Sequence, residues 1–198
     1  MTTEIYLSTD IEADGPIPGE YSMLSLGSVV VDKDGKIQGE FYKKLKPLQG
    51  AKQHPETMKF WKESLGAWKE ATSDQEDPKK VMGEYVEWYY TFRSDSDEQR
   101  LLFLTWPATF DFMSIYWYMI KFVEKHKREF RKQLPFFLAR LDIRSLAMVS
   151  LKQNYLDTHL ETLPERWIKD AGEHTHKAID DAKQHAKIFI NILKENKK

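Results

Sequence analysis

The stretch Glu4-Ile-Tyr-Leu-Ser-Thr-Asp-Ile-Glu12 decides the fold, because its apolar and β-branched residues favour a strand that ends at a Gly/Pro-rich loop over 14–21. Successive side chains of a strand point to opposite faces, so Asp10 and Glu12 share one face at the strand's carboxyl end. Two carboxylates so close together repel each other unless a cation lies between them, and Mg²⁺ or Mn²⁺ suits such oxygen ligands. The pair therefore predicts a metal site. The alternative, for so common a spacing, is that Asp10 caps a loop and Glu12 is solvated.

Two further strand-like segments, Met23–Val31 and Gly39–Lys46, are joined by a turn over 32–36 that contains Asp-Gly. They predict a hairpin that extends the first strand into an antiparallel meander. After Pro47 the pattern changes to helices, over 54–63 and 77–92, and the second of these starts with an Asp cap followed by proline. Its apolar stripe predicts a core-facing side and consists of Val81, Tyr85, Trp88 and Tyr89.

The second half alternates between strand and helix, with strands over 101–106 and 139–144 and a helix over 111–125. Such alternation implies parallel strands. We therefore expect an α/β fold with a mixed five-stranded sheet, an antiparallel meander plus parallel strands, flanked by helices. Open α/β sheets bind ligands beyond the carboxyl ends of their strands, so Asp111, shortly after Pro107, is expected near the first acidic pair. Its alternative role is that of an acidic residue favoured at a helix N-terminus.

The last helix is predicted to start near Thr175 or His176 and to pack against the sheet. Its apolar face consists of Ile179, Ala182, Ala186, Ile190 and Leu193. Asp181 lies near the helix start and is expected to project inward, with His176 in the preceding turn. Asp180 and His174 are the neighbouring competitors for these two positions.

Composition limits the remaining possibilities. A chain of 198 residues, 41% of them hydrophobic, fits one globular domain. The formal net charge of -1 excludes a basic protein that coats long duplexes, and it permits a small nucleic-acid footprint. The absence of cysteine excludes a disulfide framework and a thiolate zinc site. No signal peptide or membrane span is visible, so we expect a soluble, cytoplasmic protein.

Taken together, the motifs resemble those of the DEDDh branch of the DnaQ-like 3′-5′ exonucleases, which have the RNase H-like fold. DIE at 10–12 matches the first motif, TFDF around Asp111 the second, and HKAIDDA, with His176 and Asp181 in H-x4-D spacing, the third. RLDIRSLA around Asp142 is similar to the strand between the second and third motifs. The resemblance covers residues 1–198 as a single exonuclease domain and is strongest to small stand-alone bacterial or phage members, some of which act on RNA.

The resemblance implies a metal-dependent hydrolase that removes nucleoside monophosphates from the 3′ end of single-stranded RNA or DNA. Asp10, Glu12, Asp111 and Asp181 would hold two divalent ions, Mg²⁺ or Mn²⁺, and His176 would be the general base. The alternative function is a catalytically weak RNase H-like module that binds nucleic-acid ends.

One residue departs from the family's second motif, and three tryptophans lie outside the motifs. Pro107 stands four residues before Asp111, where many family members have Asn, and this change affects expected substrate contacts more than metal binding. Substrate-binding residues are not identifiable. Trp61, Trp68 and Trp167 are candidates either for a homodimer interface or for the core.

Overall fold

The computed structural model describes residues 3–92, 99–123 and 140–196. Its strands form one five-stranded sheet in the order β3-β2-β1-β4-β5, with β1 antiparallel to β2, β2 antiparallel to β3, and β4 parallel to both β1 and β5. The predicted mixed sheet is therefore confirmed. The strands are β1 (Thr3–Ala13), β2 (Met23–Val31), β3 (Ile37–Lys44), β4 (Gln99–Thr105) and β5 (Arg140–Asp142).

The turn between β2 and β3 shows why β3 starts earlier than the sequence pattern suggests. The Asp32 carboxylate accepts the backbone N–H groups of Asp34 and Lys36 at 2.9 and 3.0 Å, which closes the turn within a few residues. Strand pairing then resumes at Ile37 rather than at Gly39. At the other edge of the sheet, the predicted start of the last strand, Ala139, lies outside the described residues.

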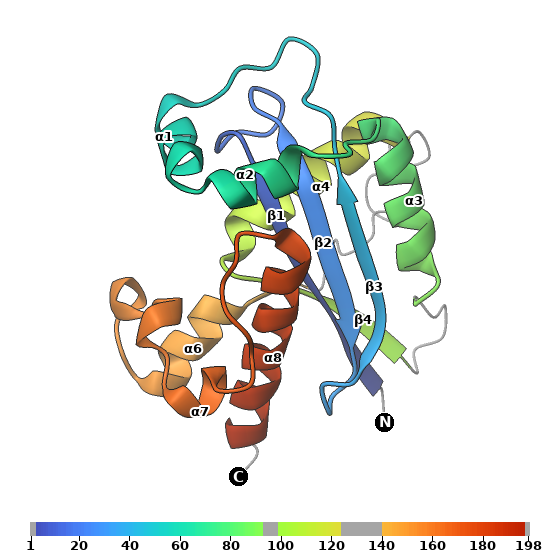
Figure 1. Cartoon of the computed structure of the whole chain (residues 1–198). Coiled ribbons are helices and arrows are strands. Elements are labelled where there is room, and N and C mark those ends of the chain that lie inside the picture. The colour runs from blue at the N-terminus through green and yellow to red at the C-terminus, as the bar shows by residue number, and fades with distance from the viewer. Residues whose placement is uncertain (1–2, 93–98, 124–139, 197–198) are drawn as a thin grey trace.

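The helices cover both faces of the sheet (Figure 1). One face carries α8 with α6 and α7, and the other carries α3 and α4. The α-helices are α1 (Pro55–Glu63), α2 (Leu65–Thr72), α3 (Pro78–Tyr90), α4 (Ala108–Phe122), α6 (Ile143–Leu151), α7 (Glu165–Ile168) and α8 (Ala178–Asn196), with single 3₁₀ turns at Tyr155–Asp157 and Leu160–Thr162. As predicted, Asp77 caps α3, because its carboxylate accepts the N–H groups of Lys79 and Lys80. None of the described helices is long and apolar enough to cross a membrane.

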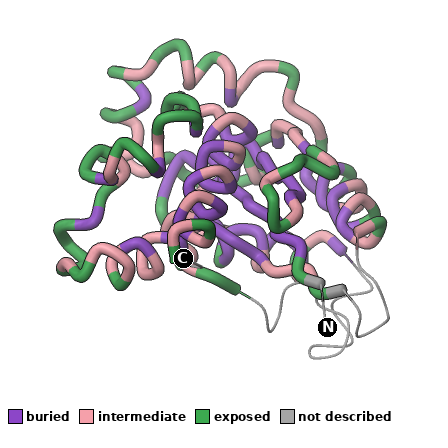
Figure 2. Tube along the Cα trace, turned by 90° about the horizontal axis from the view of Figure 1, so that it is seen from below, coloured by how far each residue is buried: buried purple, intermediate pink, exposed green. Residues whose placement is uncertain are grey.

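Alternation along β1 assigns its residues to the two layers. Ile5, Leu7 and Ile11 belong to the core beneath α3 and α4, whereas Tyr6 packs against Phe189 of α8 with ring centroids 4.8 Å apart. Figure 2 shows the buried residues concentrated in the middle of the molecule and the exposed ones around them. Positions 10 and 12 have the same parity as Tyr6, so their side chains are on the α8 face of the sheet.

Two of the three tryptophans considered for a dimer interface are core residues instead. Trp61 is 2% exposed and its indole N–H donates to the carbonyl of Ala13 at 3.0 Å. Trp167 is 1% exposed and donates to Glu195 at 2.7 Å. Trp68 is half-buried against Trp61. The interface interpretation is therefore wrong for Trp61 and Trp167, because each indole satisfies its N–H inside its own chain.

Candidate active site

Three carboxylates from the two ends of the chain meet where β1 passes the start of α8. Asp10 and Glu12 come from β1, Asp181 comes from the first turn of α8, and one oxygen from each lies within 4.8 Å of the others. All three are buried, with exposed fractions of 8%, 9% and 0%. The structure thus brings together three of the residues that the sequence predicted as metal ligands.

Asp111, the fourth predicted ligand, lies in the first turn of α4 and is joined to β1. The backbone N–H of Ile11 donates to Asp111 Oδ1 at 3.2 Å, while Asp111 Oδ2 has no hydrogen-bond partner among the described residues. The N-terminus of α4 is held in place by Asp142, which accepts the N–H of Ala108 at 2.7 Å and caps α6 by accepting that of Ser145 at 2.6 Å. Asp142 therefore supports the site as a structural residue.

The electrostatics show that the four carboxylates act on one another. Burial raises the pKa of Asp10 well above its ordinary value, and the charges of Asp111, Glu12 and Asp181 raise it further. The pKa of Glu12 is raised by burial and then by Asp181 and Asp111. Burial also raises the pKa of Asp111, despite its bond from Ile11. Four crowded, buried acids of this kind are poorly stable as anions unless a cation compensates them.

The donor atoms of this group fit hard divalent cations. All are carboxylate oxygens, which Mg²⁺ and Mn²⁺ prefer. Asp111 Oδ2 and Asp181 Oδ2 are buried and lack hydrogen-bond partners within the described ranges, although buried polar atoms are normally satisfied. A bound cation would provide the missing partner for each oxygen. We name Asp10, Glu12, Asp111 and Asp181 the acidic cluster.

His176 lies in the loop before α8, as predicted, although the helix starts two to three residues later than the sequence suggested. Its backbone φ is +55°, in the left-handed region, and its ring packs edge-on against Phe60 with centroids 4.8 Å apart. Burial and the neighbouring His174 lower the pKa of His176, whereas Asp181 opposes the shift. A largely neutral imidazole with a free lone pair is the form that can accept a proton.

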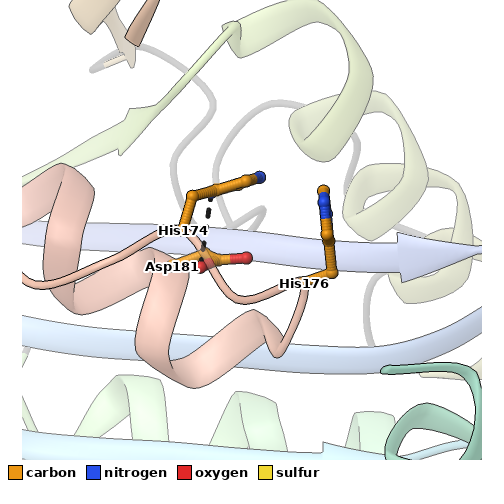
Figure 3. A group of neighbouring side chains, drawn as sticks. All are labelled: His174, His176 and Asp181. Atoms are coloured by element: carbon orange, nitrogen blue, oxygen red, sulfur yellow. Dashed lines mark ion pairs between the residues drawn. The ribbon is translucent and has the colours of Figure 1, made fainter. Parts of the chain in front are cut away.

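The structure also separates the competing residues in this segment. Asp180 is partly exposed and pairs with Lys177 at 3.3 Å, whereas Asp181 is the aspartate that lies beside Asp10 and Glu12. His174 is nevertheless close: its Nδ1 lies 3.3 Å from Asp181 Oδ1, which also accepts the N–H of Thr175 at 2.8 Å. Figure 3 shows both imidazoles beside Asp181.

His185 is a member of the site that the sequence interpretation missed. It is 1% exposed, and its Nδ1 lies 3.8 Å from Asp10 Oδ1. Neither ring nitrogen has a hydrogen-bond partner in the described part of the chain. Burial lowers the pKa of His185 to about 3. The sequence could have indicated His185 through its spacing from Asp181, since residues four apart in a helix share one face.

Gly27 was also missed, and it explains how α8 reaches the acidic cluster. It lies opposite Asp10 in the β1–β2 register. A Cβ at this position would overlap the backbone of Ala178 and Ile179, the first residues of α8. The helix start can therefore rest directly on β2, which brings Asp181 next to Asp10. A glycine inside a strand was the available signal for such a close approach.

Known proteins resemble this chain in sequence and in fold. The family model described as "3'-5' exoribonuclease Rv2179c-like domain" matches residues 6–193. The 3'-5' DNA exonuclease Cap18 of Escherichia coli is 29% identical over 98% of this chain and 96% of its own length.

Among solved structures, the nuclease domain of 3'hExo, a DEDDh family member bound to rAMP, has a TM-score of 0.69 and 15% identity over 98% of this chain and 93% of that one. The S. pombe Pop2p structure in its Mg²⁺- and Mn²⁺-bound form has a TM-score of 0.66 and 17% identity, and the match covers 94% of this chain and 82% of that one. These likenesses confirm the predicted RNase H-like fold.

Proposed function

Since the chain belongs to the family of Rv2179c-like 3′-5′ exoribonuclease domains, and is thus a hydrolase, we propose that its acidic cluster and His176 remove nucleoside monophosphates from the 3′ end of single-stranded nucleic acid. The observation that carries this proposal is the meeting of Asp10, Glu12 and Asp181 within 4.8 Å, with Asp111 bonded to the adjacent backbone of β1. Residues 1–198 act as one exonuclease domain, since the site needs both the first strand and the last helix.

In this proposal the four acids of the cluster hold two divalent ions, Mg²⁺ or Mn²⁺. Such ions, when bound, stabilise the charge that develops on the phosphate and lower the pKa of water. The unpartnered oxygens Asp111 Oδ2 and Asp181 Oδ2 supply ligand positions that no described group of the chain occupies. The Mg²⁺- and Mn²⁺-bound form of Pop2p, a structure of the same fold, supports this choice of metals.

His176 is the general base of the proposed reaction. Its loop position beside the acidic cluster allows the ring to reach a water molecule at the scissile phosphate, and its lowered pKa keeps it neutral near pH 7. Protonation of His176 by the attacking water is then stabilised by Asp181, whose charge favours the imidazolium form.

The descriptions of the relatives and the charge of the chain support the proposed substrate class. The matching family is described as exoribonuclease, Cap18 is described as a DNA exonuclease, and 3'hExo was solved with rAMP. A net charge of -1 fits a grip on a few terminal nucleotides rather than on a long duplex. We therefore propose a single-stranded 3′ end as the binding partner.

The test is digestion of matched RNA and DNA oligomers labelled at the 5′ end, with Mg²⁺ or Mn²⁺ and with EDTA. We expect metal-dependent shortening of the labelled strand from the 3′ end, with unlabelled mononucleotides as the other product, and no cleavage of oligomers blocked at the 3′ end. The oligomer that is degraded at the higher rate identifies the preferred sugar, ribose or deoxyribose. Asp181→Asn should reduce the rate by at least about 100-fold, because it removes a direct metal ligand.

Asp180→Asn is the matched control, since Asp180 is adjacent in sequence but pairs with Lys177 on the surface. It should retain wild-type activity. If the folded wild-type protein binds both oligomers and shortens neither with any metal, the exonuclease proposal fails and the end-binding module replaces it.

A further inference from the structure

Two histidines and one carboxylate gather at the start of α8, and the proposed reaction does not use all of them. His174 and His176 lie on either side of Thr175, and Asp181 follows in the first turn of the helix (Figure 3). One ligand atom from each of the three lies within 4.8 Å of the others. His174 has no part in the proposed hydrolysis, so its position needs another explanation.

The spacing of these atoms suits a small tetrahedral metal ion. In a zinc site with ligand bonds of about 2.0–2.1 Å, neighbouring ligand atoms are ~3.3–3.4 Å apart. His174 Nδ1 and Asp181 Oδ1 are already 3.3 Å apart. The ring of His176 lies near that of His174, with centroids 4.5 Å apart, and has to approach by roughly 1.5 Å at most to complete the site.

A metal site needs a charged ligand that attracts the ion and a path from solvent, and Asp181 and His174 provide these two properties. The Asp181 side chain is 0% exposed, so its carboxylate charge is little screened by solvent and is available to a cation. The His174 side chain is 36% exposed, which leaves the site accessible from solvent. A metal ion can therefore reach a partly preformed set of ligands.

The donor types distinguish this group from the acidic cluster. Two imidazoles and one carboxylate suit Zn²⁺, whereas a purely carboxylate set suits Mg²⁺ or Mn²⁺. Asp181 belongs to both groups. Occupation of one set thus changes the ligands that remain for the other.

We propose that His174, His176 and Asp181 form a Zn²⁺ site whose occupation switches the exonuclease off. The inhibitory part rests on the proposed function, because it requires His176 to be the general base. An imidazole nitrogen that donates its lone pair to Zn²⁺ cannot accept a proton, and the positive charge of Zn²⁺ on Asp181 weakens the hold of this carboxylate on an ion in the acidic cluster. Zinc would therefore block the proton transfer that hydrolysis requires.

The first experiment measures metal binding without nucleic acid or turnover. The full chain is titrated with Co²⁺, whose visible absorption reports tetrahedral coordination, and Zn²⁺ is then used to displace it. We expect one Zn²⁺ per chain at this site, and both His174→Gln and His176→Gln should weaken its binding by at least about tenfold. His159→Gln, which changes an exposed histidine outside the group, is the matched control and should bind like wild type. Unchanged zinc affinity in His174→Gln would overturn the proposed site.

The second experiment measures cleavage of the preferred oligomer in Mg²⁺ with increasing Zn²⁺. Wild-type protein should lose activity as the site fills, and His174→Gln should need at least about tenfold more Zn²⁺, relative to its own zinc-free rate. Equal zinc sensitivity of the two proteins would place the inhibitory ion in the acidic cluster and overturn the switch. A folded wild-type protein with no cleavage before zinc is added would instead overturn the proposed function, and the Co²⁺ titration would still decide the zinc site.

Discussion

Gly27 of β2 lies directly beneath Ala178, the first residue of α8, and the helix backbone occupies the space that a side chain at Gly27 would need. Because Gly27 also lies opposite Asp10, this contact sets the distance between the sheet and the first turn of the helix. The position of Asp181 beside Asp10 therefore depends on a residue that has no side chain.

Gly27→Ala should separate α8 from β2 and lower both stability and activity. Forcing a methyl group into a packed contact typically costs about 1–3 kcal/mol of unfolding free energy. Thermal unfolding and the rate of 3′-end cleavage measure the two effects. Gly83→Ala is the control, because a Cβ on Gly83 of α3 meets no atom within 4 Å and alanine favours the helix. A variant at Gly27 with wild-type activity would show that the close approach is not required.

His176→Ala should reduce kcat by roughly 10²–10⁴-fold, the usual contribution of a general base. The change leaves the acidic cluster intact, so stabilisation by Mn²⁺ in thermal unfolding should remain close to wild type. Single-turnover cleavage under saturating metal measures the chemical step. Near-normal turnover would assign the proton transfer to another group, with His174 as the next residue to replace.

Metal stabilisation should increase with pH. The raised pKa values of Asp10, Glu12 and Asp111 mean that the metal-free fold retains protons that the unfolded chain has lost. These groups therefore contribute stability at low pH that is lost as the pH rises above about 4 toward their folded-state values. A cation binds the ionised form and reverses this loss, so the shift in Tm caused by Mg²⁺ should be larger near pH 8 than near pH 5.5.

NaCl at the same ionic strength as the Mg²⁺ salt is the control for non-specific salt effects. A Mg²⁺-induced shift that is independent of pH would contradict the assignment of the metal to these carboxylates.

Buried His185 should have the opposite effect on acid stability. Its folded-state pKa of about 3 lies below its ordinary value of 6.5, so the unfolded chain binds the additional proton between these limits. The contribution of His185 to the free energy of unfolding is fully present above pH 6.5. It is lost as the pH falls, with a slope of up to ~1.4 kcal/mol per pH unit.

Denaturant unfolding of wild type and His185→Asn is measured between about pH 7 and pH 4. The difference between the two pH curves of unfolding free energy gives the contribution of His185, because both proteins have the same carboxylates. The variant should lose less stability on acidification, whatever its stability at neutral pH. Parallel pH curves for the two proteins would contradict a neutral, buried imidazole.

Local patterns were sufficient for much of the fold. The alternation of residues 4–12 predicted both β1 and the shared face of Asp10 and Glu12, because a strand has a period of two residues wherever it lies. The cap and proline at 77–78 predicted the start of α3 for an equally local reason, the unpaired N–H groups of a first helical turn. The order of strands and helices then limited the sheet to a mixed topology.

The burial of two tryptophans could not be predicted in the same way. Trp61 and Trp167 are apolar residues in polar surroundings of the sequence, which fits a core or an interface equally well. Their positions were decided by acceptors far along the chain, the carbonyl of Ala13 and the carboxylate of Glu195. The sequence also offered two adjacent aspartates, and the packing of the helix confirmed that Asp181 is the buried one and that Asp180 stays near the surface.

By itself the sequence determined the mixed sheet, four of the flanking helices (α1, α3, α4 and α8) and the types of donor available, since these depend on residue periodicity and on chemistry that each residue carries with it. The motif resemblance also predicted which donors form the site, but only the tertiary structure decided how close together they lie. Asp10 and Asp181 are brought together by strand register and by the contact of α8 with Gly27, and His185 joins them through the same packing. Distances between residues so far apart in the chain depend on how packed surfaces fit, and no local pattern contains that information.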